Sequence, residues 1–353
     1  MPAHSFIKAN SITEITGHEL LGKSFGTIHS IEKQPIKTTG FSGSSHEKIM
    51  VQLENGQAIS LILKYIYPSQ DMTIWRSGNI SNREANLLGD AGMSQVWDIF
   101  HPPYIAYAME EHASALLMHD VSAGLFPDVR EPILAEQEDL ILQKLAQLHA
   151  TFWEHPILST PWLSRQEVFF NFFGPGAVAE EKAAGRDHPI FEHVQKGWEI
   201  AMENLPASIK DFITDPPVAA LTASLPKTII HGDSKLANFA ILPGNKVCAF
   251  DWTMAAAASP ACEIGWYIAV NASRLARSKE ATLQRYREFL QTALNNKLDD
   301  KLWHQMIDAA IITGAEILLW NKALNLQKNI PGAREEWDWW VDQISRVRDK
   351  YND

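Results

Sequence analysis

The 353-residue sequence contains only two cysteines, Cys248 and Cys262. Two thiols fourteen residues apart exclude a disulfide-rich scaffold and a multi-cysteine zinc site. The sequence also lacks any run of about 18 apolar residues that could span a bilayer, and residues 1–10 lack the apolar stretch of a signal peptide. These absences predict a cytoplasmic protein with no membrane partner.

Positive charge is scarce as well. The chain has 31 Lys and Arg residues against 42 Asp and Glu residues, for a net charge of −11. This balance argues against nucleic-acid binding and against binding to anionic membranes, because both favour basic surfaces. It is compatible with a cationic substrate, although solubility is the explanation we favour. With 46% hydrophobic residues and no repeat or Gly/Ser linker, we expect a globular monomer or homodimer of one large or two modest domains.

The first 120 or so residues carry the patterns of β-strands. Ile49, Val51 and Leu53 alternate along one face of the segment 47–53, and Asn55-Gly56 is a typical hairpin turn. The other elements expected in this part are a first strand near residues 25–32, strands at 58–66, 104–109 and 113–118, and one helix at 81–88.

Beyond Asp120 the apolar residues follow helical spacing, as in Ile141, Leu145, Leu148 and Phe152. The helices predicted here are 134–153, 188–204, 279–295, 302–326 and 333–351. Pattern alone therefore indicates an α+β protein.

One polar motif interrupts the helical half. The segment His231-Gly232-Asp233-Ser234-Lys235-Leu236-Ala237-Asn238 is followed, thirteen residues after Asn238, by Asp251. Strand-like stretches at 239–242 and 247–250 flank the turn residues 243–246, which predicts a hairpin that brings Asn238 and Asp251 side by side. An amide and a carboxylate beside a second carboxylate suit Mg²⁺ bound to a nucleotide.

The motif resembles the catalytic loop and metal-binding residues of the aminoglycoside phosphotransferase and choline kinase-like families, which are small-molecule kinases. The resemblance implies a bilobal protein kinase-like fold with a small β-rich N-terminal lobe, residues 1–119, and a larger helical C-terminal lobe, residues 120–353. It also implies that Asp233 positions or deprotonates the acceptor hydroxyl, that Asn238 and Asp251 hold Mg²⁺, and that ATP is the phosphate donor.

A strand lysine and a helix glutamate complete such a site in the resembled families. Lys64 shares a face with Ile62 and Ile66 on the expected strand 58–66, and Glu84 lies on the expected helix 81–88. The resemblance implies that Glu84 directs the Lys64 ammonium at the nucleotide phosphates. In isolation, Lys64 would instead be read as a strand-edge lysine and Glu84 as a solvated helix residue.

Two backbone segments are expected to make further contacts with the nucleotide. Small residues ahead of the lysine strand allow close approach of backbone N–H groups to phosphate, although any polar loop between strands has the same composition; they are Gly40, Gly43, Ser44 and Ser45. The connection between the lobes would contact the adenine edge; its residues are Met118, His119 and Asp120.

Lys235 and the pair Glu263-Ile264 depart from the resembled families, and Gly232 departs from protein kinases. Lys235 stands where many relatives have an aromatic residue or histidine; we expect it to neutralise charge on the transferred phosphoryl group, and the alternative is a solvent-facing lysine. Gly232 replaces the arginine that pairs with a phosphorylated activation loop in protein kinases, so the enzyme is expected to need no such activation. Glu263-Ile264 replaces the usual Asp-Leu pair, and His231 is expected to be structural.

The predicted function is transfer of the ATP γ-phosphate to a hydroxyl of a small molecule such as an amino alcohol, an aminoglycoside or a sugar-like compound. The alternatives are a protein kinase and a non-catalytic nucleotide-binding regulator of the same fold. The helical half is rich in tryptophan, for which core packing is favoured over a cation-binding cage. Asn321, Glu316 and Asp338 are further pocket candidates without discriminating evidence.

Overall fold

The computed structural model describes residues 4–37, 43–78 and 81–351. Its contacts divide the chain into two compact units. The first unit comprises Met1–Asp128, Thr160–Trp162 and Ala237–Ala255, and the second comprises Val129–Ser159, Leu163–Leu236 and Ala256–Asp353. The lobe boundary expected after residue 119 stays a prediction. The first compact unit continues to Asp128 and also includes residues 237–255.

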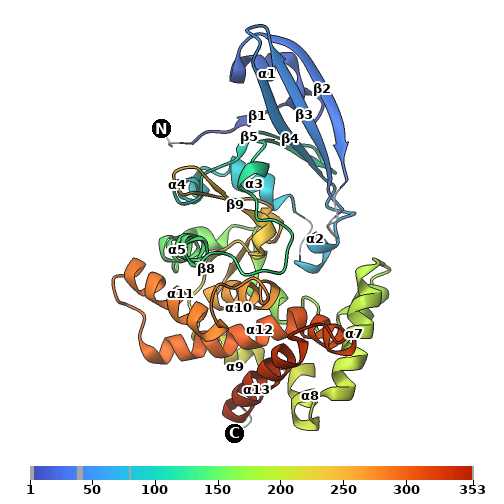
Figure 1. The fold of residues 1–353 in the computed structure, drawn as a ribbon, viewed down its shortest axis with the longest axis vertical. Helices are drawn as coiled ribbons and strands as arrows, with labels where there is room; N and C mark the ends of the chain where they lie inside the picture. The colour runs from blue at the N-terminus through green and yellow to red at the C-terminus, as the bar shows by residue number, and fades with distance from the viewer. Residues whose placement is uncertain (1–3, 38–42, 79–80, 352–353) are drawn as a thin grey trace. The chain divides into compact units, whose positions relative to one another are not determined.

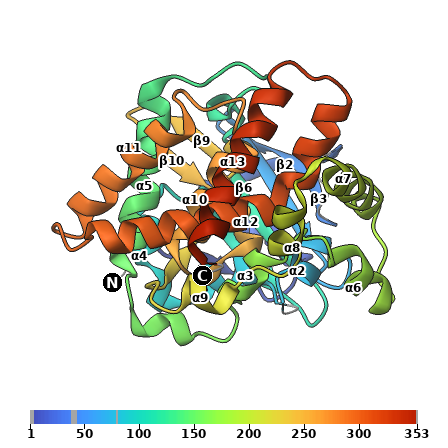
Figure 2. The same ribbon diagram turned by 90° about the horizontal axis from the view of Figure 1, so that it is seen from below.

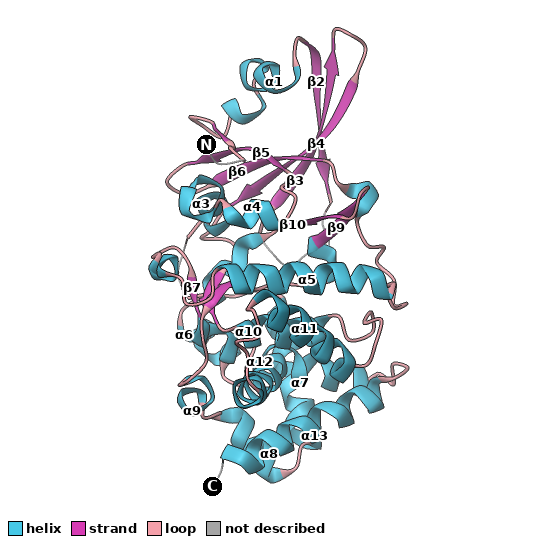
Figure 3. Cartoon of the chain, turned by 90° about the vertical axis from the view of Figure 1, so that its left-hand side faces the viewer, coloured by secondary structure: helices cyan, strands magenta, loops and turns pink. Residues whose placement is uncertain are grey.

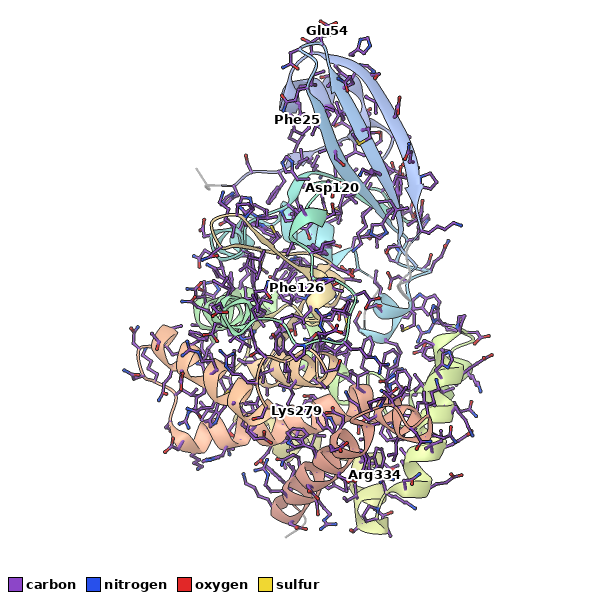
Figure 4. All side chains as sticks on the ribbon, viewed as in Figure 1. Phe25, Glu54, Asp120, Phe126, Lys279 and Arg334 are labelled. Atoms are coloured by element: carbon purple, nitrogen blue, oxygen red, sulfur yellow. The ribbon has the colours of Figure 1, made fainter. Side chains whose placement is uncertain are left out.

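A six-stranded sheet dominates the first unit, with strand order β1-β5-β6-β4-β3-β2 (Figure 1 and, in magenta, Figure 3). Its strands are β1 (Ile7–Lys8), β2 (Ile28–Ile36), β3 (Ser45–Leu53), β4 (Ala58–Ile66), β5 (Tyr104–Met109) and β6 (Ser114–His119). All neighbours pair antiparallel except β1 and β5, which are parallel. The β3–β4 turn carries Glu54, labelled in Figure 4, and Gly56 with φ of 87°.

The two faces of this sheet differ in chemistry. Ile49, Val51, Leu61 and Leu63 alternate onto one face, where they join the apolar core. Lys64 belongs to the other face. The helices of the first unit are α1 (His18–Phe25), α2 (Met72–Arg76), α3 (Arg83–Gly89) and α4 (Gln95–Ile99), with short 3₁₀ turns η1 (Glu14–Thr16), η2 (Ala91–Met93), η3 (Ser122–Gly124) and η7 (Trp252–Met254).

A separate hairpin, β9 (Phe239–Leu242) and β10 (Lys246–Ala249), also belongs to the first unit. Three residues separate the paired Leu242 and Lys246, and two of them, Gly244 and Asn245, have positive φ of 79° and 59°, a conformation that glycine and asparagine adopt readily in turns. The hairpin predicted from the turn residues is thereby confirmed. The 3₁₀ turn η6 (Leu236–Asn238) precedes it.

The second unit is mainly helical, as Figure 2 shows from below. Its helices are α5 (Ala135–Thr151), α6 (Ala177–Ala183), α7 (Ile190–Asn204), α8 (Ala207–Thr214), α9 (Val218–Thr222), α10 (Pro260–Val270), α11 (Lys279–Ala293), α12 (Asp300–Gln327) and α13 (Ala333–Tyr351). The 3₁₀ turns η4 (Pro156–Ser159) and η5 (Gln166–Phe170) and a three-stranded sheet complete it, with β11 (Ala256–Ala258) between β7 (Ser164–Arg165) and β8 (Thr228–Ile230).

The long helix α12 packs against α10 at a very short distance. A Cβ atom on Gly265 would lie 2.3 Å from the Ala310 carbonyl oxygen, and one on Gly314 would lie 2.8 Å from the Gly265 carbonyl oxygen. Glycine at both crossing positions is what lets the two backbones meet. Within the described ranges, no helix has both the length and the apolar character needed to cross a membrane.

The predicted elements agree with the structure except at the N-terminus and in the short helices. Phe25 was expected to open a strand, but it ends helix α1, and the strand β2 begins at Ile28. The expectation of a single helix in the β-rich part is wrong, because α1, α2 and α4 are also present. The short lengths of α2 and α4 give too few turns for a helical apolar period to be recognised.

The α10–α12 crossing generates a stability prediction. Gly265→Ala is expected to destabilise the protein by about 1–3 kcal/mol, because the new methyl group overlaps the Ala310 carbonyl oxygen. Gly22→Ala is the matched control: it is also a helical glycine, its new Cβ meets no atom within 4 Å, and it is expected to stabilise by about 0.5–1 kcal/mol. Denaturant unfolding measures both, and equal effects of the two substitutions would contradict the close approach.

Candidate active site

Three charged groups meet on the polar face of the first unit's sheet. The Lys64 ammonium, on β4, lies 2.6 Å from Glu84 Oε2, on α3, and 2.7 Å from Asp251 Oδ1. Lys64 is 4% exposed and Glu84 is 1% exposed, so both charges are buried. Burial alone would lower the pKa of Lys64, but the charges of Asp251 and Glu84 raise it above its ordinary value. The ammonium therefore stays positive, with its position set by the two carboxylates.

The Glu84 carboxylate makes two further contacts. Its Oε1 accepts hydrogen bonds from the Tyr104 hydroxyl at 2.6 Å and from the Asp251 backbone N–H at 2.9 Å. Burial and the charge of Glu84 raise the pKa of Tyr104 well above its usual range, so this hydroxyl remains a donor. Glu84 thus holds both the side chain of Lys64 and the backbone of Asp251.

The residue beside Glu84 on α3 strengthens the same attachment. Arg83 donates to the Ser77 hydroxyl at 2.7 Å and to the Thr253 carbonyl at 3.0 Å, and it is 1% exposed. Burial lowers its pKa to about 10, which still leaves it charged at neutral pH. Arg83 and Glu84, the first two residues of α3, therefore both bind the backbone of the segment 251–253.

The ends of the β9–β10 hairpin bring Asn238 next to Asp251. The Phe250 N–H donates to the Asn238 carbonyl at 3.1 Å, which continues the strand pairing by one step. Asp251 itself has φ 64° and ψ 55°, a left-handed conformation that is unusual for a residue other than glycine and is common near functional sites. Its Oδ1 also accepts from the Thr253 hydroxyl at 2.8 Å.

The chemistry of Asn238 and Asp251 fits Mg²⁺. Mg²⁺ is usually bound through one or two protein oxygens together with phosphate oxygens. An amide oxygen and a carboxylate on adjacent hairpin ends could supply these protein oxygens, and the Asp251 side chain is 25% exposed. Within the described residues, no group of three or more His, Cys, Asp or Glu side chains is arranged to hold a metal ion by itself.

The segment expected to approach the phosphates belongs partly to a strand. Gly40 lies outside the described residues. Ser45 was expected in a loop but begins β3, because it pairs with Tyr65 on β4. Gly43 lies directly against the chain at Gln70, where a Cβ atom would be 2.4 Å from the carbonyl oxygen. Ser44, which lies between Gly43 and Ser45 in the sequence, is buried.

The expected adenine-contacting segment ends strand β6. Met118 is opposite Ile62 on β4, and the N–H groups of His119 and Asp120 already donate to backbone carbonyls of the first unit. Asp120, labelled in Figure 4, accepts from the Ser60 hydroxyl at 2.6 Å. Burial would raise the pKa of Asp120, but its hydrogen bonds hold it at about 2. This segment is thus a paired strand end followed by an ionised aspartate.

The second unit contains the other half of the motif. The Asp233 N–H donates to His231 Nδ1 at 3.2 Å, so the His231 ring supports the loop, in line with the structural role expected for it. Lys235 lies 2.7 Å from Asp233 Oδ2, and its side chain is 39% exposed against 10% for Asp233. Lys235 therefore forms an ion pair with Asp233, the candidate catalytic carboxylate, and remains accessible to solvent.

A buried acid on α10 fixes the backbone of this loop. Glu263 accepts from the His231 N–H at 2.5 Å and from the Gly232 N–H at 3.2 Å. The imidazole of His149, which also hydrogen-bonds the Tyr286 hydroxyl at 2.6 Å, lies 3.8 Å from the Glu263 carboxylate. Burial alone would raise the pKa of Glu263, but the nearby imidazoles of His149 and His231 keep it below its ordinary value.

Comparison with known proteins identifies the family. The profile of the phosphotransferase enzyme family matches residues 81–296, more than half of the chain. The chain belongs to this phosphotransferase family. It is a small-molecule phosphotransferase, and the predicted resemblance is confirmed. No curated protein sequence matches it.

Three solved structures with related folds are distant from this chain in sequence. An ethanolamine kinase from Plasmodium vivax is 13% identical, with 93% of this chain and 85% of that chain covered and a TM-score of 0.48. A choline kinase from Streptococcus pneumoniae is 10% identical, with 95% and 100% covered and a TM-score of 0.47. A spectinomycin phosphotransferase complexed with ADP and spectinomycin is 13% identical, with 94% and 96% covered and a TM-score of 0.45.

The tryptophans of the phosphotransferase's helical unit belong mostly to its core. Core packing was the favoured interpretation, and Trp303, Trp320, Trp337 and Trp340 are all at least 94% buried. Among the pocket candidates, Glu316 is 1% exposed, and burial raises its pKa well above the usual range.

Sequence reasoning missed three residues that organise the site. Tyr104 and Arg83 lie at positions where the sequence pattern indicates only a strand and a helix. The role of Glu263 could have been found, because its departure from the usual aspartate is visible beside the catalytic loop, but its partners cannot be read from spacing.

The Glu263 network predicts a pH-dependent stability. Because its folded pKa is below the ordinary value of 4.5, the Glu263 carboxylate stabilises the fold above that pH, and this stabilisation is lost as pH falls through the lower folded value. Glu263→Gln is expected to lose about 1.5–3 kcal/mol of unfolding free energy near neutral pH. The difference from wild type should narrow below about pH 4.5.

Denaturant unfolding at a series of pH values measures this difference. Glu288→Gln is the control, because Glu288 is a half-exposed acid paired with Arg285 on the surface of α11 and should contribute less than about 1 kcal/mol. A difference between Glu263→Gln and wild type that stays constant with pH would contradict the assigned ionisation.

Proposed function

We propose that this phosphotransferase transfers the γ-phosphate of ATP, as its Mg²⁺ complex, to a hydroxyl group of a small molecule. The observation that carries the proposal is the buried contact of Lys64 with both Glu84 and Asp251. A buried ammonium held between two carboxylates, one of them at the end of a strand beside an asparagine, suits the binding of a metal-bound polyphosphate.

The first unit supplies the nucleotide contacts in this proposal. Lys64 would bind the phosphates, with Glu84 fixing its position, and Asn238 and Asp251 would hold Mg²⁺. When bound, Mg²⁺ would supply positive charge that stabilises the phosphate oxygens. The adenine would lie against Met118 and the segment to Asp120; since the N–H groups of His119 and Asp120 have protein acceptors, carbonyl oxygens and apolar side chains would contact the base.

The second unit supplies the groups that act on the acceptor. As the acceptor oxygen bonds to the γ-phosphorus, the bond from that phosphorus to the bridging oxygen of ADP breaks, and the hydroxyl proton passes to Asp233. Glu263 would keep the backbone of this loop in position through its bonds to His231 and Gly232. Lys235, beside Asp233, would offset charge on the transferred phosphoryl group.

The protein kinase alternative receives no support from the segment after Asp251. Only the turn η7, Ala255, the strand β11 and Ser259 separate Asp251 from the start of α10 at Pro260. All of these residues are described and are held in secondary structure or by hydrogen bonds, as in the N-cap contact of Ser259 with Ala261. Nothing in this stretch corresponds to a long regulatory loop.

The first functional prediction concerns Asp233. Asp233→Asn should reduce phosphate transfer by about 10²–10⁴-fold, the usual contribution of a positioned general base, with little change in ATP binding. A coupled assay of ADP release, screened over amino alcohols, aminoglycosides, macrolides and sugars, identifies the acceptor; calorimetry then measures ATP binding. Asp211→Asn on the exposed face of α8 is the control and should retain full activity. Full activity of Asp233→Asn on the identified acceptor would remove Asp233 from the mechanism.

The second functional prediction concerns Lys235. Lys235→Ala should lower kcat at least about tenfold, because a charge offset in the transition state is lost, with a much smaller change in ATP affinity. Steady-state kinetics with varied ATP separate the two effects. Lys246→Ala, which removes an exposed lysine from β10, is the matched control. If kcat is unchanged and only stability changes, Lys235 is a structural partner of Asp233.

A further inference from the structure

A histidine shares the polar sheet face with Lys64. His46 on β3 is paired directly with Lys64 on β4, and the next pair on the same face is Lys48 with Ile62. Side chains of directly opposed residues in an antiparallel pair point to the same side of the sheet. The register continues to β6, where Met118 is opposite Ile62. His46 therefore lies in line with the residues proposed above for the phosphates and the base.

The surroundings of His46 are those of the charged cluster. Burial and the Lys64 charge lower its pKa to about 4, while the charges of Asp251 and Glu84 act in the opposite direction. All three groups are thus near enough to affect the ring. At neutral pH the imidazole is uncharged and carries a single N–H.

The charged neighbours of His46 on this face form ion pairs, whereas one nitrogen of the His46 ring has no hydrogen-bond partner among the described residues. Lys48 on the same face lies 3.5 Å from Asp120, and Lys64 is bound by two carboxylates. The Nδ1 atom of the half-buried His46 ring, by contrast, is buried and has no hydrogen-bond partner among the residues that the structure describes. A buried ring nitrogen without a partner is unfavourable unless a ligand completes its contacts.

The backbone near His46 is held by packing at Gly43 and by strand pairing from Ser45 onward. Gly43 lies against the carbonyl oxygen of Gln70, closer than any side chain would allow, and Ser45 and His46 continue as paired residues of β3. His46 consequently projects from a strand rather than from a free loop, and its position relative to Lys64 is set by the register.

We propose that His46 is a phosphate-contacting residue, whose imidazole N–H donates a hydrogen bond to a phosphate oxygen of the bound nucleotide beside the Lys64 ammonium. The inference rests on the proposed function, since it requires nucleotide binding at this face. A neutral donor next to a fixed cation adds a directed contact to the phosphates without adding a second charge beside Lys64.

The test is nucleotide affinity by calorimetry, with Mg²⁺ present, for adenosine, ADP and a non-hydrolysable ATP analogue. His46→Ala should weaken binding of the ATP analogue by about tenfold, the effect of one hydrogen bond to a charged group, and leave adenosine binding unchanged. His46→Gln and His46→Asn keep a donor near the positions of Nε2 and Nδ1 respectively, and one of them should restore part of the lost affinity.

His29→Gln is the matched control, because His29 is an exposed histidine of β2 in the same sheet. It should bind all three ligands like wild type. Equal weakening of adenosine and ATP-analogue binding by the His46 variants, or no weakening in any of them, would overturn the assignment. Absence of any nucleotide binding by the wild-type protein would instead overturn the proposed function, so the two failures are distinguishable. The Gln and Asn variants also cover the case in which His46→Ala does not fold.

Discussion

The buried carboxylate of Glu84 is the group on which the candidate site depends. It meets the Lys64 ammonium, the Tyr104 hydroxyl and the Asp251 N–H at 2.6 to 2.9 Å. An ionised carboxylate at 1% exposure is tolerated only when its oxygens are satisfied by such donors. The same contacts therefore satisfy the buried oxygens of Glu84, place the ammonium, and attach the segment around Asp251 to the helix that carries Glu84.

A second carboxylate has the corresponding role in the other unit. Glu263 accepts from two consecutive backbone N–H groups of the loop that contains Asp233, and the His149 imidazole beside it hydrogen-bonds Tyr286. Each half of the motif is thus supported by one buried acid that would not itself contact substrate. The residues that would do chemistry are left on short turns whose backbones are fixed by these acids.

The parts of the structure that could be predicted are those where local chemistry decides the conformation. The turn residues Gly244 and Asn245 specify the β9–β10 hairpin, and helix α13 begins and ends where the apolar spacing indicates. The pairing of Lys64 with Glu84 was expected only from a family resemblance. Tyr104 and Arg83 could not be found, because their partners are fixed by tertiary packing and have no spacing rule. Phe25 was assigned to the wrong element because Leu20 and Leu21 of the short helix α1 are adjacent and show no period.

The first unit is assembled from separate stretches of the chain, and this affects how the protein is made. Lys64 and Glu84 leave the ribosome long before Asp251, which is 187 residues after Lys64. Until residue 251 is available, the ammonium lacks one of its two carboxylates, and Arg83 lacks the Thr253 carbonyl. A chain cut after Asp128 would contain all six strands of the sheet but an incomplete set of charges. During synthesis the N-terminal sheet therefore gains its full set of charged contacts only after the segment around Asp251 has been made.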